Sequence, residues 1–116
     1  MATNIIFDEG VQLQLAVTDP ATPASGDPVV MGQLPGVALI DEQPDGLTTI
    51  KTDGVATLSV KGTNGSNAAI NAGDILYYVA ANTPKLSATT SGVRFGYALE
   101  AVSSGATATI RVKIGY

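Results

Sequence analysis

The 116-residue sequence contains no cysteine, no histidine and no tryptophan. Without cysteine, disulfide bonds and thiolate chemistry are excluded. Without histidine, the side chain that most often serves as general base or metal ligand is missing. No Gly-rich loop ending in Lys-Ser or Lys-Thr occurs, so the common phosphate-binding motif is also absent. The sequence therefore predicts a protein that is not an enzyme and that holds no metal or cofactor.

Carboxylate pairs are the remaining route to catalysis. Asp27 and Asp74 each follow a glycine directly before a predicted strand, and a hydrolase that uses these two acids is one hypothesis. The competing interpretation, which we favour, makes both turn residues whose side chains accept hydrogen bonds from nearby backbone N–H groups. Asp41, Glu42 and Asp45 form a further acidic group. It lacks the spacing and the glycine of a calcium loop, which favours a solvated turn.

Charge is distributed unevenly along the chain. Residues 1–50 contain seven acidic residues and no Lys or Arg, whereas residues 51–116 contain all six basic residues. This polarity argues against nucleic acid as a partner and favours docking onto a protein through complementary charge. Two arrangements stay open: the halves form separately charged regions, or they interleave and the asymmetry averages out. No run of 18 apolar residues and no leader-like segment occurs, so we expect no membrane partner.

Alternating apolar residues predict an all-β fold. The clearest pattern is a hairpin of residues 93–102 and 107–114, in which Phe95, Tyr97 and Leu99 share one face and the intervening Ser-Ser-Gly-Ala supplies the turn. A second hairpin is expected across the Asp-Gly pair at 53–54, and a single helical turn at 68–72. Further strands are predicted at residues 10–17, 29–31, 36–40, 48–52, 55–61, 75–79 and 86–89.

A weak internal repeat divides the chain. Ser-Gly-Asp-Pro-Val-Val at 25–30 and Gly-Val-Ala-Leu at 36–39 are echoed by Ala-Gly-Asp-Ile-Leu-Tyr at 72–77 and Gly-Tyr-Ala-Leu at 96–99. Five residues separate the two segments in the first copy and eighteen in the second. The repeat predicts two similar β-meanders that close against each other as a small barrel or sandwich.

The N-terminal residues and one tyrosine pair are the candidate interface. Residues 1–9 are predicted to form an extended arm ahead of a single β domain at 10–116. The arm contains a run of large apolar residues, which is costly to leave in water, so we expect it to dock on this subunit or on a partner. Adjacent tyrosines face opposite sides of a strand, so one belongs to the core and the other to the surface or an interface. A non-catalytic β-sandwich that binds a glycan through this tyrosine, or binds a protein, is the alternative function. The candidate residues are Thr3, Ile5, Ile6, Phe7, Tyr77 and Tyr78.

Several of these segments resemble one family when taken together: residues 25–29, 36–39, 70–78, 96–101 and 108–112. The chain resembles the tailed-phage capsid decoration, or cement, proteins, some of which are mislabelled as recombinase-like. The resemblance runs from about residue 10 to the C-terminus. It implies a small antiparallel β-barrel or sandwich of the β-tulip kind, with short strands and long loops. The chain departs from the commoner pattern in the proline-rich segment 19–28 and in the apolar N-terminus.

The resemblance also implies a function. It suggests a virion protein that is made in the host cytoplasm and binds the exterior of the assembled capsid, where it stabilises the head by clamping neighbouring major capsid proteins. Self-association as a homotrimer is expected as well. The recombinase label finds no support in the residues, because neither a nucleotide loop nor a basic groove is present.

Overall fold

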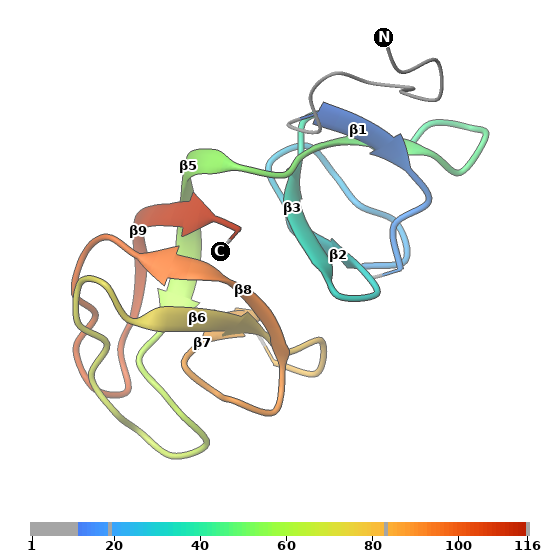
Figure 1. Ribbon diagram of the computed structural model, residues 1–116. Helices are drawn as coiled ribbons and strands as arrows, with labels where there is room; N and C mark the ends of the chain where they lie inside the picture. Colours follow the sequence, from blue (N-terminus) through green and yellow to red (C-terminus); the bar gives the residue numbers. More distant parts are fainter. Residues whose placement is uncertain (1–11, 19, 83, 116) are drawn as a thin grey trace, which may run out of the picture.

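The computed structural model describes residues 12–18, 20–82 and 84–115. These residues form strands and no helix (Figure 1). The predicted all-β class is thereby confirmed. None of these residues forms a helix that could span a membrane. The strands are β1 (Gln12–Leu15), β2 (Pro28–Met31), β3 (Leu34–Ala38), β4 (Thr48–Lys51), β5 (Gly54–Lys61), β6 (Ile75–Tyr78), β7 (Leu86–Ser87), β8 (Val93–Ala98) and β9 (Thr107–Ile114).

The strands form two units that follow each other along the chain. The first unit is a four-stranded sheet in the order β1-β4-β3-β2, and the second is a closed barrel in the order β5-β7-β6-β8-β9. Figure 1 shows them side by side, with the β4–β5 connection running between them. The expected hairpin of β4 and β5 is wrong: β4 pairs with β1 and β3, whereas β5 pairs with β9 and β7. Both edges of β4 and both edges of β5 are therefore occupied by strands of their own unit.

The internal repeat corresponds to a shared topology. β1, β2, β3 and β4 of the first unit match β5, β6, β8 and β9 of the second, because both sets follow the same order across the sheet. The register matches as well: Gly36 of β3 lies opposite Val29, and Gly96 of β8 lies opposite Leu76. The sequence echo therefore marks equivalent strands.

The two units differ in how they close. The longer spacing of the second copy contains β7, in which Leu86 pairs with Val60 on one side and Tyr78 on the other. In the first unit no described strand occupies this place. There Thr18, which follows β1, donates its N–H directly to the carbonyl of Val30 in β2 at 3.0 Å. The additional strand explains why only the second unit is a full barrel.

The main core lies inside the barrel and extends into the first unit. Phe95, Leu76 and Val112 are fully buried there, and Val30 and Val37 of the first unit belong to the same apolar cluster. β3 lies against β8 and β9. A smaller cluster of three buried residues, Val29, Ala38 and Ile50, fills the first sheet. The first unit therefore depends on the barrel for part of its burial.

Alternation correctly predicts which residues of β9 are buried, but it fails for β8. Ile110, Val112 and Ile114 are buried and their neighbours are exposed. In β8, however, Phe95 and Ala98 are both buried. The register with β6 shifts between Leu76 and Tyr77, so β8 carries one additional residue at a β-bulge and its inward face changes phase there.

The expected helical turn at 68–72 is also wrong. Ile70 is fully buried and forms an isolated antiparallel bridge with Val102. Each of the two residues donates its N–H to the other's carbonyl at 2.8 Å. The extended conformation of residue 70 allows both hydrogen bonds, and a helical turn at 68–72 would break them.

Candidate interaction surface

The two turn aspartates stabilise equivalent turns. The N–H of Ala24 donates to Oδ2 of Asp27 at 3.0 Å, and the N–H of Asn71 donates to Oδ2 of Asp74 at 2.9 Å. This confirms the interpretation of both as turn residues. Because each carboxylate is engaged in a different unit, the arrangement offers no support for the hydrolase hypothesis.

The acidic segment after β3 is hydrogen-bonded to its surroundings. Oδ1 of Asp41 accepts from the N–H of Ser25 at 2.8 Å, and Oδ1 of Asp45 accepts from the N–H of Leu47 at 3.0 Å. In the part of the chain that the structure describes, no group of three or more acidic, histidine or cysteine side chains is placed to hold a metal ion. The segment is an exposed turn whose carboxylates accept hydrogen bonds from backbone N–H groups.

The tyrosine pair is divided between core and surface, as alternation predicted. Tyr78 is 2% exposed, and its ring stacks on that of Phe95 with centroids 6.5 Å apart. Tyr77 is half-buried on the other face of β6. Of these two interface candidates, only Tyr77 is accessible to a partner. The other four candidates, Thr3, Ile5, Ile6 and Phe7, lie outside the described residues, so the arm stays a prediction.

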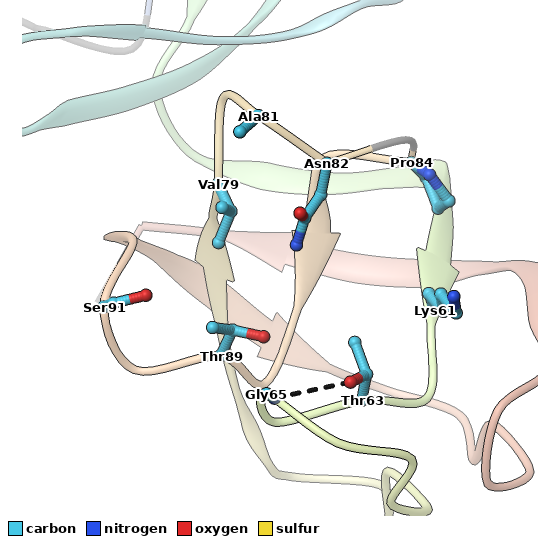
Figure 2. A pocket seen from close by; sticks show the side chains of 9 residues that line it. All are labelled: Lys61, Thr63, Gly65, Val79, Ala81, Asn82, Pro84, Thr89 and Ser91. Carbon is cyan, nitrogen blue, oxygen red and sulfur yellow. Dashed lines mark hydrogen bonds between the residues drawn. The ribbon is translucent and has the colours of Figure 1, made fainter.

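One polar hollow opens beside the segments that flank β7 (Figure 2). Its volume is about 480 Å³, and Thr63, Asn82 and Thr89 are among the side chains that line it. In Figure 2, the N–H of Gly65 bonds to the hydroxyl of Thr63 at the base of the hollow. Among the described lining residues, Lys61 is the one titratable group. Thr63, Asn82 and Thr89 supply hydrogen-bonding groups to the hollow.

Among the described residues, four large apolar side chains are exposed, and none of them was predicted as a surface residue: Leu39, Ile40, Val55 and Leu99. Leu39 and Leu99 occupy equivalent positions, directly after β3 and β8. The N–H of Leu39 donates to Thr49 of β4, and the N–H of Leu99 donates to Arg111 of β9. The repeated Ala-Leu pair was a signal for this equivalence. The prediction that Leu99 shares the face of the buried Phe95 is wrong, because the bulge in β8 reverses the phase.

The two units carry opposite charge. Residues 1–53 contain eight acidic residues and one lysine, for a net charge of −7, and residues 54–116 contain five basic and two acidic residues, for +3. The sum of −7 and +3 is the −4 of the whole chain. Because the described strands of each half form separate sheets, the described parts of the two halves do not interleave. The charge asymmetry of the sequence therefore persists in the folded protein.

The comparison with known families matches nearly the whole chain. The family model described as phage cement protein aligns with residues 8–114. The chain belongs to the phage cement protein family. This confirms the resemblance seen in the sequence and supports a capsid decoration role for a structural, virion-associated protein. No curated protein and no solved structure matches the chain.

The features of this cement protein suit contact with other proteins. A protein that stabilises an assembly works through contact area, for which exposed apolar side chains within a polar surround are the usual signature. Each of its two units contributes such side chains: Leu39 and Ile40 from the first, and Val55 and Leu99 from the second. These surfaces are the candidate functional site.

Proposed function

We propose that this cement protein binds the outer surface of the assembled capsid as a homotrimer and clamps neighbouring major capsid proteins. The observation that carries the proposal is the presence of two equivalent β units, each with an exposed leucine at the same position. A clamp must contact two neighbours at once, and a duplicated unit supplies two related contact surfaces in one chain. Membership of the cement family supports the same role.

Energetic considerations favour many contacts over one specialised site. Stable protein interfaces bury about 1,600 Å² in total, and a symmetric oligomer repeats its contacts with every subunit. Binding that occurs only with the intact head stabilises that head by mass action. Cementing therefore requires surface and symmetry, and it does not require an active site.

The N-terminal arm is the proposed strand-forming contact. If residues 2–7 are extended, Thr3, Ile5 and Phe7 share one side of the strand. An extended segment of this kind can pair with an exposed sheet edge of a capsid protein through main-chain hydrogen bonds. The competing arrangement adds the arm to this protein's own first sheet, where β1 is an edge strand.

Deletion of residues 2–7 distinguishes these arrangements. If the arm pairs with the capsid, the shortened chain keeps its circular dichroism spectrum and binds heads at least tenfold more weakly, a loss of about 1.4 kcal/mol. An unfolded deletion variant would place the arm in the protein's own fold. Undiminished binding would show that the arm contributes nothing to docking.

The function itself is tested by the stability of heads. Heads stripped of this protein, and stripped heads to which it has been added back, are heated or treated with chelator while DNA release is measured. We expect the decorated heads to retain DNA to a higher temperature. A control add-back uses the chain with Leu39→Ser and Leu99→Ser, which removes both exposed leucines and is expected to protect less. Equal DNA loss with and without the protein would refute the proposal.

A further inference from the structure

The outer face of the β5–β9 pair is a long, exposed surface. The two strands pair over eight residues each, from Gly54 opposite Ile114 to Lys61 opposite Thr107. The residues that point into the barrel, such as Leu58 and Val112, are buried, whereas the alternate residues are exposed or half-buried along the whole pair. No described element therefore covers this face.

The chemistry of this face favours an acidic partner with an apolar side chain. Val55 is 56% exposed, and Lys113 lies directly opposite it. Arg111 is the next outward residue of β9, and Lys61 lies at the far end of β5. The rest of the outward row consists of Ser and Thr hydroxyls. The face thus combines one apolar contact with three cations, of which Arg111 is bridged at 3.5 Å by Glu100.

A segment with the opposite charge lies in the other unit of the same chain. Residues 39–45, directly after β3, present Leu39 and Ile40 at 38% and 41% exposure. Asp41 and Asp45 are exposed beside them, and Glu42 is half-exposed. The segment has the composition that the β5–β9 face fits: apolar side chains surrounded by carboxylates. Because both surfaces remain exposed within one chain, they do not cover each other there.

We propose that residues 39–45 of one copy dock on the β5–β9 face of the next copy. This inference rests on the proposed self-association and names the surfaces that carry it. A contact between two different patches is head to tail, and it closes into a ring when the rotation between copies allows. Complementary charge steers such an encounter and fixes its orientation, and the apolar side chains are desolvated at its centre. Three copies in a ring would give the proposed trimer.

Charge reversal tests the pairing of the two surfaces. One variant carries Glu42→Lys with Asp45→Lys, and a second carries Lys61→Glu with Lys113→Glu. Each variant alone then has like charge on both surfaces, so we expect its dissociation constant for self-association, measured by sedimentation, to rise at least tenfold. Lys85→Glu is the control, because Lys85 lies between β6 and β7 and on neither strand of this face, and it is expected to associate like the original chain. Thermal melts verify that each variant is folded.

Complementation makes the test specific. Mixing the two variants in equal amounts should restore contacts between unlike copies and give pairs or even-numbered assemblies, because a ring of three always places two copies of one variant next to each other. A single chain with all four substitutions should regain the oligomer of the original protein. Association should also weaken as salt is raised. Variants that associate like the original chain, or folded variants that do not associate when mixed, would overturn the proposal while leaving self-association intact. An original chain that stays monomeric both free and on heads would overturn self-association itself. Variants that associate normally but no longer bind heads would assign both surfaces to the capsid, and that result also overturns the proposal.

Discussion

The two β units share a strand order and a register but differ in closure and core. Twelve buried residues of the second unit form the main cluster together with Val30 and Val37 of the first, whereas the described part of the first sheet has a separate cluster of only three. The segment containing β7 accounts for much of the difference, because it inserts Leu86 between β5 and β6. A short insertion thus turns one copy of a repeated sheet into a barrel that supports the other.

The largest expected effect on stability comes from removing the buried aromatic ring of Phe95. Phe95 is fully buried and stacks on Tyr78, so Phe95→Ala should lower the free energy of unfolding by about 4 kcal/mol. Because the first unit packs on the barrel, both units should melt together. Ile50→Ala in the small cluster should cost about 3 kcal/mol and leave hydrogen-exchange protection in β9 unchanged. Protection lost only from the barrel after Phe95→Ala would show that the first unit is independent.

The equivalent glycines Gly36 and Gly96 should differ in their tolerance of a methyl group. A Cβ on Gly96 would overlap the carbonyl oxygen of Lys113, whereas one on Gly36 would lie 2.9 Å from the carbonyl oxygen of Lys51. We expect Gly96→Ala to cost about 3 kcal/mol and Gly36→Ala about 1 kcal/mol, since overpacking against backbone forces the strands apart. Urea unfolding measures both. Equal costs would mean that the closer approach of β8 to β9 has no energetic consequence.

The turn aspartates should behave alike. Asp27→Ala and Asp74→Ala each remove one acceptor for a backbone N–H of the same turn, so each should cost about 1 kcal/mol. Their matched Asn variants, which keep an acceptor oxygen, should cost less. A difference above about 1 kcal/mol between the two alanine variants in thermal or urea unfolding would contradict the structural equivalence of the turns.

The smallest effect is expected at a buried hydroxyl. Thr48 is fully buried in β4, and its Oγ1 has no hydrogen-bond partner among the described residues; the equivalent residue of β9 is Ile110. Thr48→Val keeps the shape and removes the desolvated hydroxyl, so it should be neutral or raise the free energy of unfolding by up to about 1 kcal/mol. Thr48→Ser, which keeps the hydroxyl and loses the methyl group, is the control and should destabilise. A clearly destabilised valine variant would reveal a hydrogen bond at Thr48.

Local patterns were sufficient where the backbone stays regular. Alternation placed every residue of β9 on its correct side, and the repeated Gly-Asp turns and Ala-Leu pairs predicted two similar meanders. The wrong predictions concern residues whose conformation depends on pairing with strands that are distant in the sequence. The bulge in β8 depends on pairing with β6, and the Asp-Gly pair at 53–54 favoured a tight turn that the partners of β4 and β5 override.

The candidate surface was less predictable than the fold. Val55 points outward with Thr57 and Ser59, so alternation along residues 55–61 was a signal that could have placed it on the surface. Whether an outward side chain is covered depends on neighbouring elements, which periodicity does not describe. The exposure of Leu39 and Ile40 is of the same kind, because a strand was expected to continue to residue 40 but β3 ends at Ala38. The charge asymmetry was visible in the sequence, but only the separation of the two units gave it spatial meaning.

The most direct test of the account is electron microscopy of heads with and without this protein. We expect additional density on the outer surface, at boundaries between neighbouring major capsid proteins, into which copies of this two-unit chain with dimensions of 49 × 33 × 22 Å can be fitted. Both units of each copy should touch protein. Identical outer surfaces in the two preparations, or additional density only on the inner surface, would contradict it.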